Sequence, residues 1–528
     1  MSLSDFVRAY WTLDTPDCKK FGRYSCKNCL LVLHCGPECQ KSHWPTHKTD
    51  CKSPVGKPTW TPDWASEKRS PACVGPAVVP FGGKKYLWGN VPAFDVLQLA
   101  SNEGEDFVGP IRLLFAAQLS QSYRGSVEIT LNDRDADVVA RNVMMLLVAF
   151  VVDNVDEAIE CIIHVWYSAF IRESDLAVLQ QQIRPLIQDV CGEMKTTMAG
   201  DLVAKVWTFW KRSVRLVLPK SAWDRLLSFM QVPAGLTAEK AQKIRKAVTT
   251  AESRKDYRDR HLLFETPPHR IARTRFREDG LLLPFGHPRH EFKEPNPTFF
   301  QGTDTWPIHD NADPLHGWPS KDVEDTSSGP ATADIYSKLL FNLKTSLRAF
   351  MDRMSGIQIS FRHFQMEVSE DLPGCTDPSH PRQIKVSNIS DCGYLGIRRT
   401  LAFAVPLLQE PSVNTHATLI TLFMNAVSEN MTAGDRAARM NSNSRTMKRM
   451  LKYLPVKALP TGEYDPMITS SPTLAILFAK ELKFPEVAQF YGMAMKEKHT
   501  IIEKCPLRLK LRPGQPGAQD EFDRWKRL

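Results

Sequence analysis

Six of the twelve cysteines in this chain of 528 residues lie between Cys18 and Cys51, and three histidines lie among them. Thiolate and imidazole are ligands that zinc prefers in proteins. Three pairs have ligand spacing: Cys26 and Cys29, Cys35 and Cys39, and His47 and Cys51. The first pair is a C-x-x-C motif. The other two pairs are four residues apart, which places both side chains on one face of a helical turn. A chance cluster of core cysteines is disfavoured by this repetition. Three pairs supply one and a half tetrahedral sites, so the sequence predicts zinc and leaves one ligand set incomplete.

The rest of the composition narrows the class of protein. The other cysteines are scattered and are interpreted as small buried residues. The first residues, MSLSDFVRAYWTLD, lack the pattern of a secretory signal, so we expect an intracellular protein, cytoplasmic or nuclear, with reduced thiols. The longest apolar run, Val143 to Val152, is about half of a bilayer span, which predicts a buried helix and no membrane association. The net charge of +9 is spread over the whole length, which disfavours nucleic-acid binding.

Residues 15–51 resemble the MYND zinc finger, a pattern of four ligand pairs in which Gln40, Trp44 and Lys48 also match. The family interleaves its sites, so that the second and fourth pairs hold one zinc ion and the first and third pairs hold the other. The resemblance therefore implies one complete site, made of Cys26, Cys29, His47 and Cys51. Pro45 fits the first residue of a last short helix. His34 and His43 lie off the ligand positions and are expected at the surface.

The chain departs from the family at the first pair, where the family has two cysteines. Cys18 stands as the second member, and the position of its partner holds Thr15, a poor zinc ligand. The implied second site then has three ligands, Cys18, Cys35 and Cys39, with Asp14, Asp17 or water as substitutes for the fourth. An open zinc position can be catalytic, but no general base is indicated here. Loss of the ligand or an imperfect gene model is the preferred interpretation.

The middle of the chain reads as alternating strands and helices. Strand-like stretches at 111–117 (IRLLFAA) and 126–131 (SVEITL) precede an apolar helix over Ala136–Val152. The stretches YLWGNVPAFDVLQLA, LLFAA and LNDRDADVVARN resemble the uncharacterised N-terminal domain of dynein axonemal assembly factor 3, which many fungal MYND proteins share. The resemblance implies an α/β fold, with a Rossmann-like, methyltransferase-like body beside a small cross-braced zinc finger. Only QLSQSYRG separates the two strands, which is too short for a crossover helix between parallel strands.

Asp133 and Asp135 follow the second strand, where a dinucleotide or S-adenosyl ligand would place a ribose-binding acid. Aspartate is also a common turn and N-cap residue between a strand and a helix, and we favour this structural interpretation. The glycines of FGGKK lack the G-x-G-x-x-G frame of a dinucleotide site. The sequence therefore assigns the body no catalytic and no cofactor-binding residue.

A chain of this length exceeds one hydrophobic core, so several domains are expected. We expect a finger at 15–51, a linker at 52–80, an α/β domain at 81–230, a basic helix and Pro/His-rich loop region at 231–330, and a C-terminal α/β region at 331–528. Helical patterns lie near 155–170, 176–199, 203–217, 232–257, 331–354, 399–408, 418–430 and 472–482, and a strand lies in QIKVSNISDCGYLG. The stretch 264–330 is expected to be an ordered loop with the surface histidines His287, His290, His309 and His316.

Together these features predict a zinc-dependent interaction or scaffold protein whose finger recruits a partner. The MYND resemblance implies that the partner is a protein, in the form of an extended, proline-containing peptide. Leu30, Leu31, Val32, Leu33 and Trp44 either line its groove or form the small core of the finger, and the sequence leaves both interpretations open. The alternative is a degenerate S-adenosylmethionine-dependent methyltransferase. A SET-type methyltransferase is disfavoured because FMNAVSEN lacks the Asn-His motif and no cysteine cluster follows Cys392. The sequence names neither the partner nor the oligomeric state.

Overall fold

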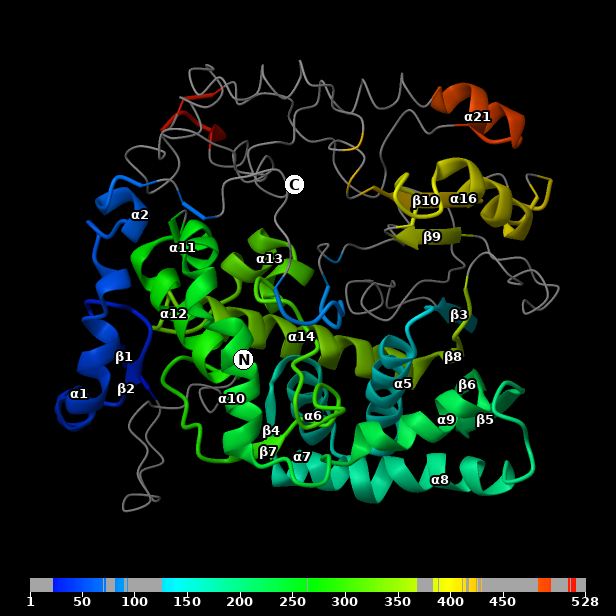
Figure 1. Ribbon diagram of the computed structural model, residues 1–528, viewed down its shortest axis with the longest axis horizontal. Helices are drawn as coiled ribbons and strands as arrows, with labels where there is room; N and C mark the ends of the chain where they lie inside the picture. The colour runs from blue at the N-terminus through cyan, green and yellow to red at the C-terminus, as the bar shows by residue number, and fades with distance from the viewer. Residues whose placement is uncertain are drawn as a thin grey trace. The chain divides into compact units, whose positions relative to one another are not determined.

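The computed structural model describes residues 22–69, 71–72, 81–89, 93, 126–263, 265–367, 383–387 and 389–410, and short pieces between 412 and 518 (Figure 1). The strand expected at 111–117, the helix expected at 472–482, and Cys18 with Asp14, Thr15 and Asp17 lie outside the described residues. The chain divides into two compact units, one made of residues 1–93, 140–203 and 218–351 and the other of 94–139, 204–217 and 352–528. Among the described helices, none has the length and apolar character to cross a bilayer.

A sheet of four strands forms the centre of the second unit, in the order β3 (Ser126–Asn132), β8 (Gln358–Phe364), β6 (Arg212–Pro219), β5 (Leu202–Phe209). The first three strands are parallel to one another. Side chains alternate between the two faces, and one face is apolar and buried, formed by Val127, Ile129, Val214, Leu216, Ile359 and Phe361. The strand expected at 126–131 is confirmed.

Two rows of the opposite face are polar, and we call them the polar sheet face: Glu128, Thr130, Ser213, Arg215, Ser360 and Arg362, all only partly buried. The next row of that face holds the buried apolar residues Val217 and Phe364. Parallel sheets in doubly wound folds are covered on both faces and are apolar on both. The chain is thus a mixed α/β protein, and the described residues give a Rossmann-like, methyltransferase-like body no support. A second parallel pair joins β9 (Gln383–Ser387) to β10 (Thr418–Leu422), followed in the chain by α21 (Phe484–Phe490).

One expected helix is a pair of strands, and a second begins with a strand. The segment 203–217 forms β5 and β6, joined by a turn at Trp210 and Lys211. Its β-branched and aromatic residues fit a pleated strand better than a helix. The segment expected to be helical at 418–430 begins with β10, where Thr418, Ile420 and Thr421 favour a strand for the same reason. The strand in QIKVS is confirmed as β9, and the helix near 399–408 is confirmed as α16 (Ile397–Ala404) with the 3-10 turn η7 (Val405–Leu407).

Helices dominate the first unit, which also holds most of α5 (Ala136–Val151) and of α14 (Ile335–Gly356). Its other body elements are α6 (Val155–Tyr167), β4 (Phe170–Arg172), α7 (Glu173–Ala177), a π-helical turn (Val178–Ile183), α8 (Arg184–Glu193), α9 (Lys220–Leu226), α10 (Ala238–Thr249), α11 (Lys255–Leu263), α12 (Pro267–Asp279), β7 (Phe292–Pro295) and α13 (Ser320–Asp325), with 3-10 turns at Leu227–Met230, Glu252–Arg254 and Pro314–Gly317. The helical patterns near 155–170, 176–199, 232–257 and 331–354 are therefore confirmed. Strands β4 and β7 pair antiparallel.

The Pro/His-rich stretch is ordered as expected, but it begins with a helix. Pro267 and Pro268 occupy the first positions of α12, where a missing N–H is tolerated, and Gly280 ends it in the left-handed conformation with a φ of 72°. The two prolines thus mark a helix start, which the expectation of a loop overlooked. Further along, large side chains pack in the core: Phe299, Phe300, Trp306, Ile308 and Trp318. His290 and His316 are exposed, while His287 and His309 are half-buried.

Asp133 and Asp135 cap the start of α5. Asp135 Oδ1 accepts a hydrogen bond of 2.8 Å from the Asp137 amide, and Asp133 Oδ1 accepts one of 2.8 Å from the Asp135 amide. These bonds satisfy amides that a helix start leaves without an intrahelical partner. The capping interpretation therefore accounts for both acids without a bound nucleotide.

Candidate metal centre

The first two ligands lie in a turn between two short strands, β1 (Tyr24–Ser25) and β2 (Leu33–His34), which pair antiparallel. The Cys26 amide donates to the Val32 carbonyl at 3.2 Å, and the Leu30 amide donates to the Cys26 carbonyl at 2.8 Å. Leu30 adopts the left-handed conformation with a φ of 55°. This tight backbone brings the Cys26 and Cys29 thiols to the same side of the turn.

The other two ligands lie one helical turn apart near the end of α1 (Pro37–Cys51). This helix is a single element of 15 residues with Pro45 inside it, so the expectation that Pro45 begins a separate short helix is wrong. The four ligand atoms of Cys26, Cys29, His47 and Cys51 lie within 4.8 Å of one another, and all four residues are buried. The structure therefore brings together the four residues that the MYND resemblance implies as one zinc site.

The distances inside this group fit a tetrahedral zinc ion. Cys26 Sγ lies 3.8 Å from Cys51 Sγ, and Cys29 Sγ lies 3.4 Å from His47 Nε2. With Zn–S of about 2.3 Å and Zn–N of about 2.0 Å, a regular tetrahedron requires about 3.8 Å between sulfurs and about 3.5 Å between sulfur and nitrogen. Both measured separations match. The donor set of three thiols and one imidazole is closed, which is typical of a structural zinc site rather than a catalytic one.

The three thiols shift one another's protonation. A hydrogen bond from the Cys29 thiol lowers the pKa of Cys26 to about 3, and the same bond raises the pKa of Cys29. Burial raises the pKa of Cys51. Without a cation only one thiol of the three is therefore ionised, and zinc binding must release protons from the others. The Asn28 side chain donates to Cys51 Sγ at 3.2 Å and orients that sulfur from outside the ligand set.

The histidines that were expected at the surface lie beside this group. His34 is buried, and its Nε2 lies 3.2 Å from His43 Nδ1. The His43 ring in turn stacks on the ligand His47, with 5.4 Å between ring centroids. Burial lowers the pKa of His34, and it lowers the pKa of His43 to about 4, so both rings are neutral at physiological pH. The surface expectation for His34 is wrong because β2 directs its side chain against α1.

The proposed second site is described only in part. Cys39 is buried in the first turn of α1, and Cys35 is half-buried just before that helix. Among the described residues, the only group with metal-ligand geometry is the one around His47. A second zinc ion held by Cys18, Cys35 and Cys39 stays a prediction.

The finger is fixed to helix α12 of the body within the first unit (Figure 1). Arg270 donates to the carbonyls of Val55 and Lys57 at 2.6 and 2.9 Å, in and directly after the 3-10 turn Pro54–Gly56 that follows α1. Arg275 lies 3.4 Å from both carboxylate oxygens of Asp50. The Ala333 amide donates to the Leu30 carbonyl at 3.3 Å. The finger therefore contacts the body on one side.

Part of the segment expected to be a linker is also bound to the body. It contains the short helix α2 (Asp63–Ser66), and Asp63 forms an ion pair with Lys255 of α11. Arg69 makes a paired interaction with Asp256, at 2.5 and 2.8 Å. The Arg270 guanidinium lies over the Trp60 ring, 5.0 Å from the ring centroid. These contacts hold residues 54–69 against α11 and α12.

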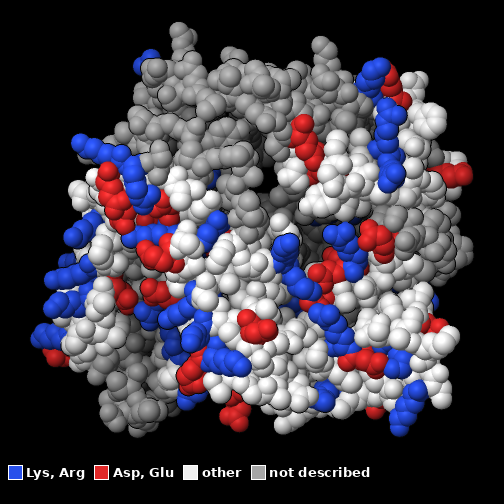
Figure 2. Space-filling model, viewed as in Figure 1, with Lys and Arg blue, Asp and Glu red and all other residues white. Residues whose placement is uncertain are grey.

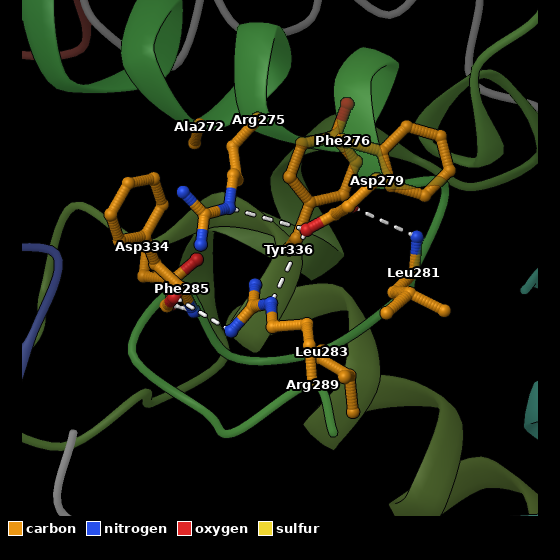
Figure 3. A pocket seen from close by; sticks show the side chains of 10 residues that line it. All are labelled: Ala272, Arg275, Phe276, Asp279, Leu281, Leu283, Phe285, Arg289, Asp334 and Tyr336. Atoms are coloured by element: carbon orange, nitrogen blue, oxygen red, sulfur yellow. Dashed lines mark hydrogen bonds and ion pairs between the residues drawn. The ribbon is translucent and has the colours of Figure 1, made fainter. Parts of the chain in front are cut away.

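A small pocket lies between α12 and the start of α14 (Figure 3). Arg275 and Arg289 both reach Asp279, at 3.3 and 3.2 Å. Asp334 accepts hydrogen bonds from the amides of Phe285 at 2.6 Å and Ser337 at 3.1 Å, and burial raises its pKa to about 6. Two guanidiniums and two carboxyl groups balance each other here, so the pocket has no charge excess that would select an ion.

A relay resembling a nucleophile and its base lies in the core, and sequence reasoning missed it. His164 Nδ1 lies 3.1 Å from Ser168 Oγ, and His164 Nε2 lies 3.3 Å from Glu160 Oε2. The signal was present as Glu and His spaced four apart on α6 and Ser four residues further, directly after that helix. Both His164 and Ser168 are 0% exposed, and Ser168 Oγ accepts the Leu282 amide at 3.1 Å. No substrate reaches this serine, and its contacts join the end of α6 to the segment after α12.

Comparison with known families supports this site. A family model described as MYND finger matches residues 16–51, which contain all four ligands. A second, described as a domain of unknown function (DUF4470), matches residues 87–171, which contain β3, α5, α6 and the first two residues of β4. Neither match bears on the fungal type or on the resemblance to the dynein assembly factor. No solved structure matches the chain. The chain thus carries a MYND zinc finger, a module of protein interaction, and the activity of its body is not indicated.

Proposed function

We propose that this chain is a zinc-dependent interaction protein in which the MYND finger binds an extended peptide of a partner and the body serves as a scaffold. The observation that carries the proposal is the division of the finger into two sides. The metal group and the contacts to α12 occupy one side, through Asp50, His47 and Cys51. Gln40 and Trp44, one turn apart on α1, are exposed.

The exposed residues form a surface suited to an extended chain. Trp44 is 37% exposed and Tyr24 on β1 is 61% exposed. Each of the two lies beside a histidine of the finger. Tyr24 pairs with His34 across the strands, and the Trp44 ring lies 6.0 Å from the ring of His47. Flat aromatic rings bind proline well, since a proline-rich segment is already extended and loses little entropy on docking. A short strand such as β1 also offers a place for strand addition.

The groove expected from the sequence includes residues that are buried in the structure. Leu31 and Val32 are 1% exposed and Leu33 is 8% exposed, so these three belong to the interior. Leu30 and Trp44 remain accessible. We therefore place the peptide over Tyr24, Gln40 and Trp44 instead of along the leucines.

Lysines surround this surface and bear on the kind of partner. Lys27, Lys41, Lys48 and Lys52 are all exposed, and Figure 2 shows Lys and Arg side chains along the edge where Figure 1 places α1. Their charge favours a peptide with acidic residues near its prolines. Because α1 is a full-length helix, duplex DNA is the competing ligand that an experiment has to separate from peptide.

The test uses the full chain with zinc bound. Binding to a proline-rich peptide library and to duplex DNA is measured at about 0.15 M salt, where purely electrostatic contacts are weakened. Trp44→Ala is compared with Trp210→Ala, which removes another exposed tryptophan, far away in the sequence on the β5–β6 turn. We expect peptide affinity to fall at least about tenfold in the Trp44 variant alone, as for an interface anchor. Selective DNA binding without peptide binding, or equal losses in both variants, would overturn the proposal.

A further inference from the structure

The polar sheet face of the second unit carries more positive than negative charge. Arg215 of β6 pairs directly with Arg362 of β8, and Arg362 pairs with Thr130 of β3 on its other side. In the next row, Ser360 stands between Glu128 and Ser213. Two guanidiniums and one carboxylate therefore share this face.

The two arginines differ in what they contact. Arg362 lies 2.9 Å from Glu128, and the two side chains are 15% and 40% exposed. Arg215 is half-buried, and within the part of the chain that the structure describes its side chain makes no ion pair or hydrogen bond. Neighbouring strands are about 4.8 Å apart, so the two guanidiniums begin from adjacent positions on one surface. Like charges placed directly opposite each other destabilise a sheet.

An oxyanion between the two arginines would relieve this repulsion. Guanidinium groups bind phosphate and carboxylate in a paired, fork-like geometry. Hydroxyl donors stand next to them, since Ser213 Oγ lies 3.1 Å from Ser360 Oγ and Thr130 shares the row of Arg362. Glu128 is held by Arg362, which leaves Arg215 as the cation that selects the anion.

We propose that the polar sheet face binds a phosphate group through Arg215 and Arg362, with the hydroxyls of Ser213 and Thr130 as further donors. The phosphate is either a free ion or part of a small molecule such as a nucleotide. This site is separate in sequence and chemistry from the zinc finger, and it requires no activity of the finger.

Thermal unfolding and calorimetry of the full chain test the proposal, at constant ionic strength with chloride replaced by inorganic phosphate. We expect a saturable rise of the unfolding temperature with a Kd below about 10 mM, the range of a weak small-ion site. Arg215→Gln should weaken this binding at least tenfold. Arg184→Gln should leave it unchanged, because this half-buried arginine of α8 contacts only Gln231 among the described residues.

A second readout separates ligand binding from a structural role. In phosphate-free buffer Arg215→Gln should unfold at the same or a higher temperature than the parent protein, because it removes the like-charge pair; a merely structural arginine would give a lower one. If that variant fails to fold, Arg215→Lys keeps the charge and should weaken binding by loss of the fork. ADP at equal phosphate concentration identifies the source, since a larger shift than with phosphate indicates a nucleotide and an equal shift indicates the free ion. Absence of a saturable shift, or equal shifts in the parent and Arg215→Gln, would overturn the proposal.

Discussion

Arg270→Met should separate the finger from the body at a large cost in stability. The Arg270 side chain is buried and donates to three carbonyl oxygens, those of Val55 and Lys57 next to the finger and that of Glu265 at 3.2 Å. Methionine fills similar volume and leaves these carbonyls without their donor. A hydrogen bond to a charged group contributes about 1.5–3 kcal/mol, and such contributions are not additive. We therefore expect a loss of about 3 kcal/mol in the free energy of unfolding.

Arg275→Met is the matched control on the same helix. Arg275 also contacts the finger, but its ion pair with Asp50 is 3.4 Å long, and the two side chains are 34% and 29% exposed. Solvent screening reduces such a pair to about 0.2–1 kcal/mol. Arg275 also forms a partly exposed ion pair with Asp279, at 3.3 Å within α12 itself. Both variants therefore remove one arginine of α12 that contacts the finger region, but only Arg270→Met leaves buried carbonyls without a donor.

Denaturant unfolding of the zinc-saturated chain gives the two free energies, and amide hydrogen exchange shows where protection is lost. We expect Arg270→Met to increase exchange in residues 52–57 and in α12 together. Zinc removal from the parent protein should increase exchange in α1 and also in α12, since the metal orders the finger that α12 contacts. Equal costs for the two variants, or a chelator effect that stops at residue 51, would refute the coupling.

Three further outcomes follow from the same structure. Cys29→Ser should lose the tightly held zinc and unfold the finger, whereas Cys191→Ser should keep the zinc, and metal analysis measures both outcomes. Two tightly held zinc ions per parent chain would show that the site near Thr15 is complete. Asp334→Asn should flatten the pH dependence of stability. Burial raises the pKa of Asp334 from 3.8 to about 6, so the native state binds this proton more tightly than the unfolded state does. This binding stabilises the fold by about 3 kcal/mol below pH 4, and the stabilisation is lost as the pH rises through 6. Unfolding measured at several pH values tests this dependence. S-adenosylmethionine at near-millimolar concentration should give no saturable heat in calorimetry, and clear saturation would revive the methyltransferase alternative.

The metal group could be predicted from the sequence because its determinants are local. The ligand pairs lie at fixed spacing within 26 residues, and the MYND resemblance implied which two pairs share one ion. The errors arose where local preference was ambiguous. The segment 203–217 has apolar residues at both helical and strand spacing, and its pairing with β8, far away in the chain, decided for a strand. In α12, two prolines that usually interrupt structure instead begin it.

Contacts between distant residues were beyond any sequence pattern. Arg270 and Val55 are separated by 215 positions, and nothing near either residue indicates the other. The same holds for the pairing of Arg215 with Arg362, which depends on the register of β6 against β8. A periodic pattern gives the side of a strand on which a residue lies, but not which residue lies beside it. Both the attachment of the finger and the charge of the polar sheet face therefore required the structure.

Attachment to α12 has a consequence for how a partner can approach. Asp50 and the ligands His47 and Cys51 lie on the sides of α1 that face the body and the metal, so they are not available to a ligand. Gln40 and Trp44 occupy the remaining side. A finger on a free tether could present any face, but one held by Arg270 presents only this one, in a fixed orientation to the body. Preorganisation of this kind reduces the entropy lost on binding, and it makes the body, rather than the finger alone, the determinant of where a recruited partner is placed.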